Sequence, residues 1–282
     1  MVEIQEALAQ ASQLLGHQGV DSPRLDAELL LAHVLDTNRA MVLAWPDRQL
    51  TPKQLTLYRN LVSRRAGREP LAYILSHREF FGLDLVVDPR VLVPRPETEV
   101  LVEEALRMAQ QMERPLRVAD VGAGSGAIAV ALAFHLPEAA VYALDEAAGA
   151  LEVTAANARR HRVSRRVHCL QGHLLSPLPE KVHLITANLP YVATGEWDAL
   201  APEIRSYEPR SALVGGDDGL ELIRALLAMA RPYLEPRGGI LLEIGAGQGV
   251  EAMAAASEHF PDAQIELRQD YAGLDRVLVV ST

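Results

Sequence analysis

The stretch that decides the fold is "ADVGAGSGAIA", residues 119–129. An apolar run ends near Asp120, glycines occupy every second position from Gly122 to Gly126, and a helical pattern follows directly. Glycines permit a tight turn and let backbone N–H groups approach a ligand. Asp145 ends the next predicted strand, where a carboxylate can accept hydrogen bonds from both hydroxyls of a ribose. The combination predicts a site for a cofactor that contains adenosine.

The chemical identity of this cofactor has two candidates. Gly122, Gly124 and Ala127 satisfy the G-x-G-x-x-G/A pattern of enzymes that bind a dinucleotide. Gly126 is an extra glycine, and a carboxylate at Asp120 would repel a pyrophosphate but attract the ammonium group of a methionine. Both features favour S-adenosylmethionine over NAD. A simple cap on the loop is the alternative role for Asp120.

Strand and helix patterns alternate on both sides of this loop. Strands are predicted at residues 116–122, 140–146, 166–172, 181–188, 238–245, 263–269 and 275–282. Such alternation predicts an α/β fold with an open, mostly parallel sheet covered by helices on both faces. The last two strands are joined only by "DYAGLD", which is too short for a helical crossover, so we expect them to be antiparallel.

A second informative stretch is "TANLPYVATG", residues 186–195. Asn188 ends the fourth strand, and ligands bind at the carboxyl ends of the strands in such sheets. Pro190 biases Leu189 toward an extended conformation, in which its carbonyl can face the crevice beside the side-chain carbonyl of Asn188. Two neighbouring acceptors suit an –NH2 group, and Tyr191 offers a flat face for stacking. These four residues are predicted to clamp a planar nitrogen nucleophile.

The chain is long enough for two domains. Residues 1–75 show helical patterns, with "DSP" and "TP" as helix starts, and predict a small helical bundle. Residues 76–93 are rich in β-branched and aromatic residues and predict a β-hairpin connector. Residues 94–282 form the predicted catalytic domain, whose first helix begins near Thr98. A second glycine cluster, "EIGAGQG" at 243–249, is interpreted as a structural turn.

Composition limits the classes of function. The net charge is -10, with no long basic run, which argues against direct binding of nucleic acid. Cys169 is the single cysteine, so an intrachain disulfide and a thiolate zinc site are excluded, and we expect no metal. The first residues lack the pattern of a signal peptide, and no apolar run is long enough to span a membrane. We therefore expect a cytoplasmic protein.

Further segments carry a resemblance to a known family. They are "SPRLDAELLLAHVL" (22–35), "REFFGLDLVVDPRVLVPRPETEVLVE" (78–103), "EPRSALVGGDDGL" (208–220) and the terminal "DYAGLDRV", together with both stretches quoted above. With these motifs the chain resembles, over nearly its whole length, the PrmC/HemK family, the N5-glutamine methyltransferases of peptide chain release factors.

The resemblance implies a class I methyltransferase domain with a Rossmann-like, seven-stranded sheet that has one reversed strand at its end. It implies that S-adenosylmethionine donates a methyl group to the glutamine of a Gly-Gly-Gln loop, leaving S-adenosylhomocysteine, and that the N-terminal helices help dock the release factor. The amide clamp would be Asn188, Leu189, Pro190 and Tyr191. The expected cofactor-binding residues are Asp120, Gly122, Ala123, Gly124, Ser125, Gly126, Asp145, His173, Leu174 and Asn188.

Three positions depart from the family's usual pattern. Leu189 replaces the first proline of N-P-P-Y, His173 replaces an aspartate expected near the adenine, and His183 lies in a strand that commonly reads Phe-Asp-Leu-Ile. Two other functions stay open at this stage. An adenine-N6 nucleic-acid methyltransferase uses the same clamp for a flipped base, although the net charge opposes it. A non-catalytic protein that binds S-adenosylmethionine is supported only by the three departures.

Overall fold

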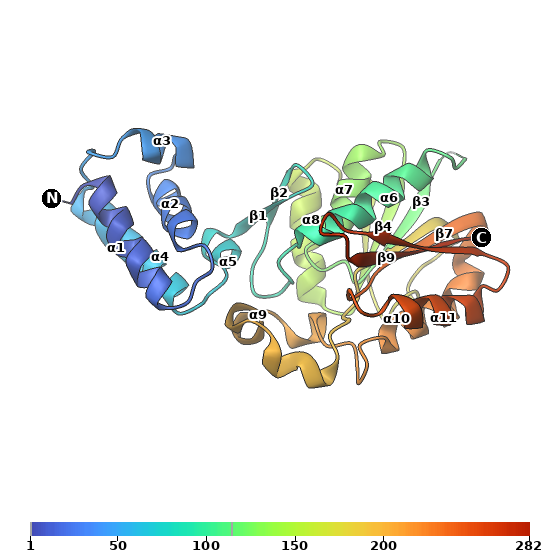
Figure 1. Ribbon diagram of the computed structural model, residues 1–282. Coiled ribbons are helices and arrows are strands. Elements are labelled where there is room, and N and C mark those ends of the chain that lie inside the picture. The colour runs from blue at the N-terminus through green and yellow to red at the C-terminus, as the bar shows by residue number, and fades with distance from the viewer. Residues whose placement is uncertain (1, 114) are drawn as a thin grey trace. The chain divides into compact units, whose positions relative to one another are not determined.

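The computed structural model describes residues 2–113 and 115–282. The chain divides into two compact units, which Figure 1 shows with their helices and strands labelled. The helical unit contains the residues up to Ser76 and, in addition, Ala201–Tyr207. The sheet unit contains His77–Leu200 and Glu208–Thr282. The sequence patterns do not predict that Ala201–Tyr207 belongs to the helical unit.

The helical unit packs its helices around one apolar core. Its helices are α1 (Ile4–His17), α2 (Pro23–Val34), α3 (Arg39–Ala44), α4 (Pro52–Ala66), α5 (Leu71–Leu75) and α9 (Pro202–Tyr207). The predicted start at Thr51 is a capping box in which Thr51 and Gln54 satisfy each other's backbone N–H groups. Ser22 precedes Pro23 at the start of α2 but makes no side-chain cap.

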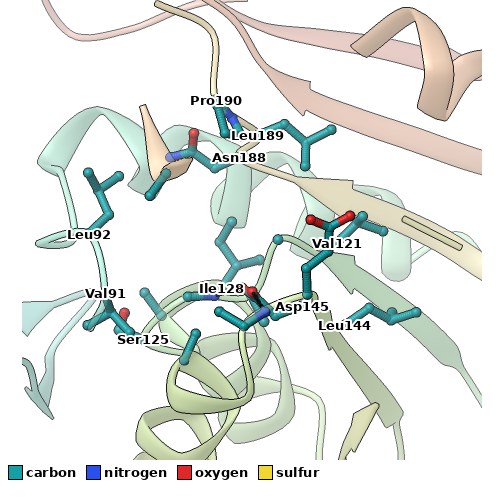
Figure 2. A pocket seen from close by; sticks show the side chains of 18 of the residues that line it. Val91, Leu92, Val121, Ser125, Ile128, Leu144, Asp145, Asn188, Leu189 and Pro190 are labelled. Atoms are coloured by element: carbon teal, nitrogen blue, oxygen red, sulfur yellow. Dashed lines mark hydrogen bonds between the residues drawn. The ribbon is translucent and has the colours of Figure 1, made fainter. Parts of the chain in front are cut away.

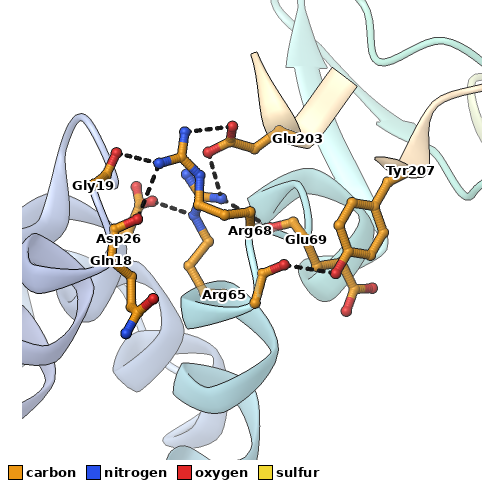
Figure 3. A network of polar contacts seen from close by, with 9 residues as sticks. Gln18, Gly19, Asp26, Arg65, Arg68, Glu69, Glu203 and Tyr207 are labelled. Atoms are coloured by element: carbon orange, nitrogen blue, oxygen red, sulfur yellow. Dashed lines mark hydrogen bonds and ion pairs between the residues drawn. The ribbon is translucent and has the colours of Figure 1, made fainter. Parts of the chain in front are cut away.

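A partly buried charge network ties α9 to the other helices of this unit (Figure 3). Glu203 accepts hydrogen bonds from Arg65 Nη1 at 3.1 Å and from Arg68 Nη2 at 2.6 Å. Arg65 also donates through Nε to Asp26 at 2.7 Å. Burying a charge is costly unless it is paired, so the two arginines need the carboxylate that α9 supplies. This pairing explains why a segment distant in sequence belongs to the helical unit.

The sheet unit contains a seven-stranded sheet with the order β5-β4-β3-β6-β7-β9-β8. Its strands are β3 (Arg117–Val121), β4 (Ala140–Asp145), β5 (Val167–Gln171), β6 (Val182–Ala187), β7 (Leu234–Glu243), β8 (Gln264–Gln269) and β9 (Asp275–Ser281). All seven predicted strands are present. The strands up to β7 are parallel, and β9 is antiparallel to both β7 and β8, so the predicted reversed strand is confirmed. Strand β9 is the second strand from one edge of the sheet, and β8 forms that edge.

Helices cover both faces of this sheet (Figure 1). α6 (Glu99–Ala109), α7 (Ala127–His135) and α8 (Ala148–Arg160) pack on one face, and α10 (Glu221–Ala230) and α11 (Gly249–His259) pack on the other. Successive strand residues point to opposite faces, and Val118 and Ala119 accordingly belong to different apolar cores. The strands are apolar on both faces, as a parallel sheet between two helical layers requires.

Short elements complete the sheet unit. The predicted hairpin consists of β1 (His77–Phe80) and β2 (Leu83–Val86), which pair antiparallel. The 3₁₀ turns are Pro96–Thr98, Thr194–Ala199, Arg210–Ala212 and Arg231–Tyr233. Among the described helices, none combines the length and the apolar character that a crossing of the lipid bilayer requires.

We expect Glu203→Ala to loosen α9. Without its carboxylate, the guanidinium groups of Arg65 and Arg68 lose a charged partner in a site with little water, a loss of about 2 kcal/mol, or roughly thirtyfold in local opening. Amide hydrogen exchange at Ile204 and Arg205, whose N–H groups both bond to the carbonyl of Ala201, measures it.

The matched control is Glu152→Ala. Glu152 is also paired with an arginine, Arg90, but its side chain is 72% exposed. Exposed ion pairs contribute little to stability, so amide hydrogen exchange at Ile204 and Arg205 should not change measurably in the Glu152 variant. Equal effects of the two substitutions would contradict the role given to Glu203.

Candidate functional site

A cavity lies at the carboxyl ends of the parallel strands of the sheet unit (Figure 2). Its lining includes most of the residues that the sequence singles out, drawn from the ends of four strands. These are Gly122, Ala123, Gly124, Ser125, Asp145, His173, Leu174, Asn188, Leu189 and Pro190. Three others, Asp120, Gly126 and Tyr191, do not line it. The register of the sheet explains why these residues lie close together. Val121 pairs with both Leu144 and Ala187, so the residues that follow these three positions lie side by side.

The glycine loop uses its own amides to hold its shape. The N–H groups of Gly122 and Ala123 both donate to the carbonyl of Leu144, at 2.8 and 2.9 Å. The N–H of Gly124 donates to Asp145 Oδ2 at 2.9 Å. These amides are therefore committed within the protein and do not form an array for a pyrophosphate. This geometry favours S-adenosylmethionine over a dinucleotide.

Gly124 leaves open space beside the glycine loop because it has no side chain. Its φ is +54°, a conformation that favours glycine. A Cβ placed there would meet only the carbonyl oxygen of Gly122 within 4 Å, at 3.9 Å. The space beside the loop is therefore open to a ligand that approaches the backbone.

Gly126 has a structural role and does not line the cavity. A Cβ at this position would lie 2.8 Å from Thr154 Cγ2 on α8. Glycine is needed here because the start of α7 packs directly against α8. A contact between Gly126 and the cofactor stays a prediction.

Asp120 also lies outside the cavity, and its alternative role as a cap is the one that the geometry supports. Its side chain is buried, with the residue 1% exposed. Oδ2 accepts a hydrogen bond from the N–H of Ala129 at 3.0 Å, and Oδ1 accepts one from Thr186 Oγ1 at 3.1 Å. Burial raises the pKa of Asp120 to about 7, although these two hydrogen bonds oppose the rise. The carboxyl group holds the first turn of α7 against β3.

Asp145 is positioned to accept hydroxyl groups of a ligand. It is half-buried at the end of β4 and lines the cavity. Oδ2 accepts from Gly124 and Oδ1 accepts from the N–H of Ala147 at 2.9 Å. These two bonds fix the carboxylate, and each oxygen keeps a further lone pair for a ligand.

His173 lies at the cavity rim beside Glu146. Its Nδ1 hydrogen-bonds to Glu146 Oε1, and both side chains are more than half exposed. Leu174 and Leu144 provide apolar lining nearby. An apolar surface with polar groups at its edge suits a heteroaromatic ring.

Asn188 extends from the end of β6 toward the turn Pro96–Thr98. Its Nδ2 donates to Thr98 Oγ1 at 3.1 Å. Within the described residues, neither Asn188 Oδ1 nor the carbonyl of Leu189 has a hydrogen-bond partner. The two acceptors predicted for the clamp are therefore free. The Leu189 side chain is buried and lies over Gly122.

Tyr191 does not line the cavity, and its stacking role stays a prediction. Its Oη donates to Glu243 Oε1 at 3.2 Å, and its carbonyl accepts from Gln248 Nε2 at 2.9 Å. Burial raises the pKa of Tyr191, and the charge of Glu243 adds to the rise. Gln248 belongs to the second glycine cluster, where it also accepts from the N–H of Gly245. That cluster thus supports the loop from behind, in agreement with its structural interpretation.

The sequence interpretation assigned no site role to the segments that complete the cavity. The end of the connector contributes Val91 and Leu92, the turn before α6 contributes Arg95 and Thr98, and the segment after α9 contributes Pro209, Ser211 and Ala212. Both lie in stretches that carry the family resemblance, which was the available signal. The buried Glu208 joins them, because it accepts from the N–H of Val93 at 3.1 Å and from Arg95 Nη2 at 2.6 Å.

His183 is remote from this site. Its Nδ1 accepts from the N–H of Arg117 at 3.1 Å, where β3 begins. This is the amino end of two parallel strands, opposite the cavity. The departure at this position therefore leaves the site unaltered. Within residues 2–113 and 115–282, no group of three or more His, Cys, Asp or Glu side chains is arranged to hold a metal ion.

Two family descriptions match the chain. The PrmC N-terminal domain matches residues 6–75, and the methyltransferase small domain matches residues 97–204. The chain is 44% identical to the release factor glutamine methyltransferase of Geobacter sulfurreducens, over 94% of this chain and 91% of the relative. It is 42% identical to the protein of the same name from Nitratidesulfovibrio vulgaris, over 98% of this chain and 94% of the relative.

A solved structure shares the fold. The 16S rRNA methyltransferase RsmC of T. thermophilus, in complex with AdoMet and guanosine, aligns with a TM-score of 0.52. The alignment covers 73% of this chain and 49% of that one, at 17% identity.

Asp120→Asn should change how stability depends on pH. The folded pKa of about 7 lies above the ordinary value of 3.8, so the stabilisation is complete below the ordinary value and is lost as pH rises through about 7. Asparagine can accept from Ala129 and donate to Thr186, and it does not ionise. Wild type should therefore lose unfolding free energy relative to the variant as the pH rises from the ordinary pKa of 3.8 to about 7, and no further above it. Parallel pH profiles in urea unfolding would contradict the buried-cap role.

Proposed function

The chain belongs to the family of release factor glutamine methyltransferases, and we propose that it methylates the side-chain amide nitrogen of the glutamine in the Gly-Gly-Gln loop of peptide chain release factors. S-adenosylmethionine is the proposed methyl donor. The reaction is assigned to the cytoplasm, where translation terminates. The observation that carries the proposal is the pair of free acceptors at Asn188 and Leu189, beside the glycine loop and Asp145.

The cavity fits S-adenosylmethionine in three respects. The loop at Gly124 leaves room for a ligand against the backbone. Asp145 presents fixed carboxylate oxygens suited to the two hydroxyls of a ribose. Leu144 and Leu174 supply apolar surface for the adenine, with His173 at its edge in place of the family's aspartate. When bound, S-adenosylmethionine supplies an electrophilic methyl group on a sulfonium cation.

The residues of this chain act chiefly by alignment. The nitrogen of an amide is a weak nucleophile because its lone pair is delocalised, so its orientation determines the rate. Asn188 Oδ1 and the Leu189 carbonyl accept the two N–H groups of the glutamine and bind them more strongly as positive charge develops on nitrogen. Pro190 holds the loop extended, and Leu189 excludes water beneath it. The proton then leaves to water after the transfer.

The helical unit is proposed to dock the release factor. It is the part of the chain that matches the PrmC N-terminal domain. Leu43 and Trp45 at the end of α3 are each 44% exposed, and Arg48 lies over the ring of Trp45. Exposed aromatic and arginine side chains are typical anchors of protein interfaces.

The experiment that tests this function is methyl transfer from labelled S-adenosylmethionine to a purified release factor. A copy with the loop glutamine changed to alanine is the matched control, and DNA is a third substrate. We expect label on the first protein alone. Label on DNA would support the nucleic-acid methyltransferase, and cofactor binding without transfer to any substrate would support the non-catalytic protein.

Asn188→Ala should lower kcat by roughly 10²–10³, because one polar contact aimed at the reacting group is lost. The affinity for S-adenosylmethionine should stay nearly constant, as measured by calorimetry. Asp145→Ala provides the contrast, since it should weaken cofactor binding first. Near-normal turnover of the Asn188 variant would remove Asn188 from the clamp.

A further inference from the structure

One half of the proposed clamp is a backbone group, the carbonyl of Leu189. A side chain at the same position cannot adjust a backbone carbonyl, so its place depends on what holds the chain on either side. On the amino side, Ala187 pairs with Leu242 in the sheet. On the carboxyl side, Tyr191 lies beyond the end of β6, and contacts with other loops must hold it.

Gln248, the residue before α11, makes such a contact with Tyr191. Its Nε2 donates to the carbonyl of Tyr191 at 2.9 Å and to the carbonyl of Asp218 at 3.2 Å. Its Oε1 accepts from the N–H of Gly245 at 2.8 Å. These partners fix the orientation of the side-chain amide, because two carbonyls need donors and an N–H needs an acceptor. One side chain therefore joins the clamp loop, the loop before α10 and the turn after β7.

These loops approach one another closely at Gly219. Its φ is +75°, and a Cβ there would lie 2.1 Å from the carbonyl oxygen of Tyr191 and 2.7 Å from Gln248 Nε2. The ring end of Tyr191 is held as well, because its Oη donates to Glu243 Oε1 at 3.2 Å. Residues of the segment from the end of β7 to the start of α11 thus hold both the backbone and the ring of Tyr191.

We propose that Gln248 is a positioning residue for the methyl transfer, which fixes the Tyr191 carbonyl and thereby sets the place of the Leu189 carbonyl. This inference rests on the proposed function. Gln248 does not line the cavity, so it acts through the clamp loop and not on the substrate. A displacement of an orienting group by about 1 Å can cost roughly a hundredfold in rate, so a contact two residues away affects turnover.

The first test is Gln248→Glu. Glutamate has nearly the size of glutamine and keeps an acceptor for Gly245, but its carboxylate cannot donate to the two carbonyls. We expect kcat to fall roughly tenfold to hundredfold. The KM for the release factor and the affinity for S-adenosylmethionine, measured by calorimetry, should stay within about threefold of wild type, because neither depends on the exact place of the Leu189 carbonyl.

The matched control is Arg224→Ala. It removes an exposed ion pair to the side chain of Asp218, in the same loop, and leaves the hydrogen bond between Gln248 and Tyr191 in place. Its kcat should equal that of wild type. A loss of kcat in Arg224→Ala as large as in Gln248→Glu would show that general loosening of the loop lowers turnover, and would overturn the positioning role.

Gly219→Ala and Gly273→Ala form a second matched pair, which decides the question if Gln248→Glu does not fold. Both glycines have a positive φ, +75° and +78°, so both substitutions strain the backbone. A Cβ at position 219 also collides with Tyr191 and Gln248, whereas a Cβ at position 273 meets nothing within 4 Å. We expect a loss of kcat in Gly219→Ala alone. Normal kcat in both Gln248→Glu and Gly219→Ala, or equal losses in the two glycine variants, would overturn the inference.

The failure of the proposed function is a separate outcome. It would appear as a wild-type enzyme that transfers no label to the release factor. The hold of Gln248 on the clamp loop is then decided by amide hydrogen exchange at Val192, which follows Tyr191 and donates to the carbonyl of Leu213 at 2.9 Å. Faster exchange in Gln248→Glu than in Arg224→Ala supports this hold, and equal exchange overturns it.

Discussion

The site depends on one constraint, the register of three adjacent parallel strands. Because Val121 pairs with Leu144 and Ala187, three chain segments leave the sheet at the same level. Hydrogen bonds along the strands fix that level, so a shift of one residue would turn each side chain to the opposite face. The pairing of the strands therefore places the glycine loop, Asp145 and Asn188 next to one another. Catalytic geometry is therefore set by the most buried and rigid part of the sheet unit.

Two buried carboxyl groups support the two sides of the cavity from behind. Asp120 joins the first turn of α7 to Thr186, and Glu243 accepts a hydrogen bond from Tyr191 Oη, directly after the clamp residues that line the cavity. Each lies at or near the end of its strand and contacts a segment that lines the cavity without lining it itself. Burial raises the pKa of both groups. Buried carboxyl groups thus support the ligand-binding loops, although their burial lowers the stability of the domain.

The sequence predicts the fold well because strand and helix periods differ and because "DYAGLD" is too short to permit a crossover. It does not reveal that β9 lies between β7 and β8, since strand order depends on contacts distant in sequence. The sequence also predicts which residues at strand ends line the cavity, because ligands bind at the carboxyl ends of parallel strands. It does not predict the positions of Asp120, Gly126 and Tyr191, because a motif specifies residue types but not where each side chain points. The attachment of α9 to the helical unit depends on Glu203, and a single acidic residue in a polar segment gives no signal of its partner.

The position of β9 also affects how the sheet is assembled during synthesis. β8 makes its pairing contacts with β9, and β9 pairs with β7 on its other side. A growing chain presents its strands in order, and residues 275–281 are the last of them to emerge. Until then the edge of β7 stays open and β8 has no neighbour in the sheet. A chain that lacks β9 therefore exposes the unprotected strand edge of β7, which β9 covers by pairing with it.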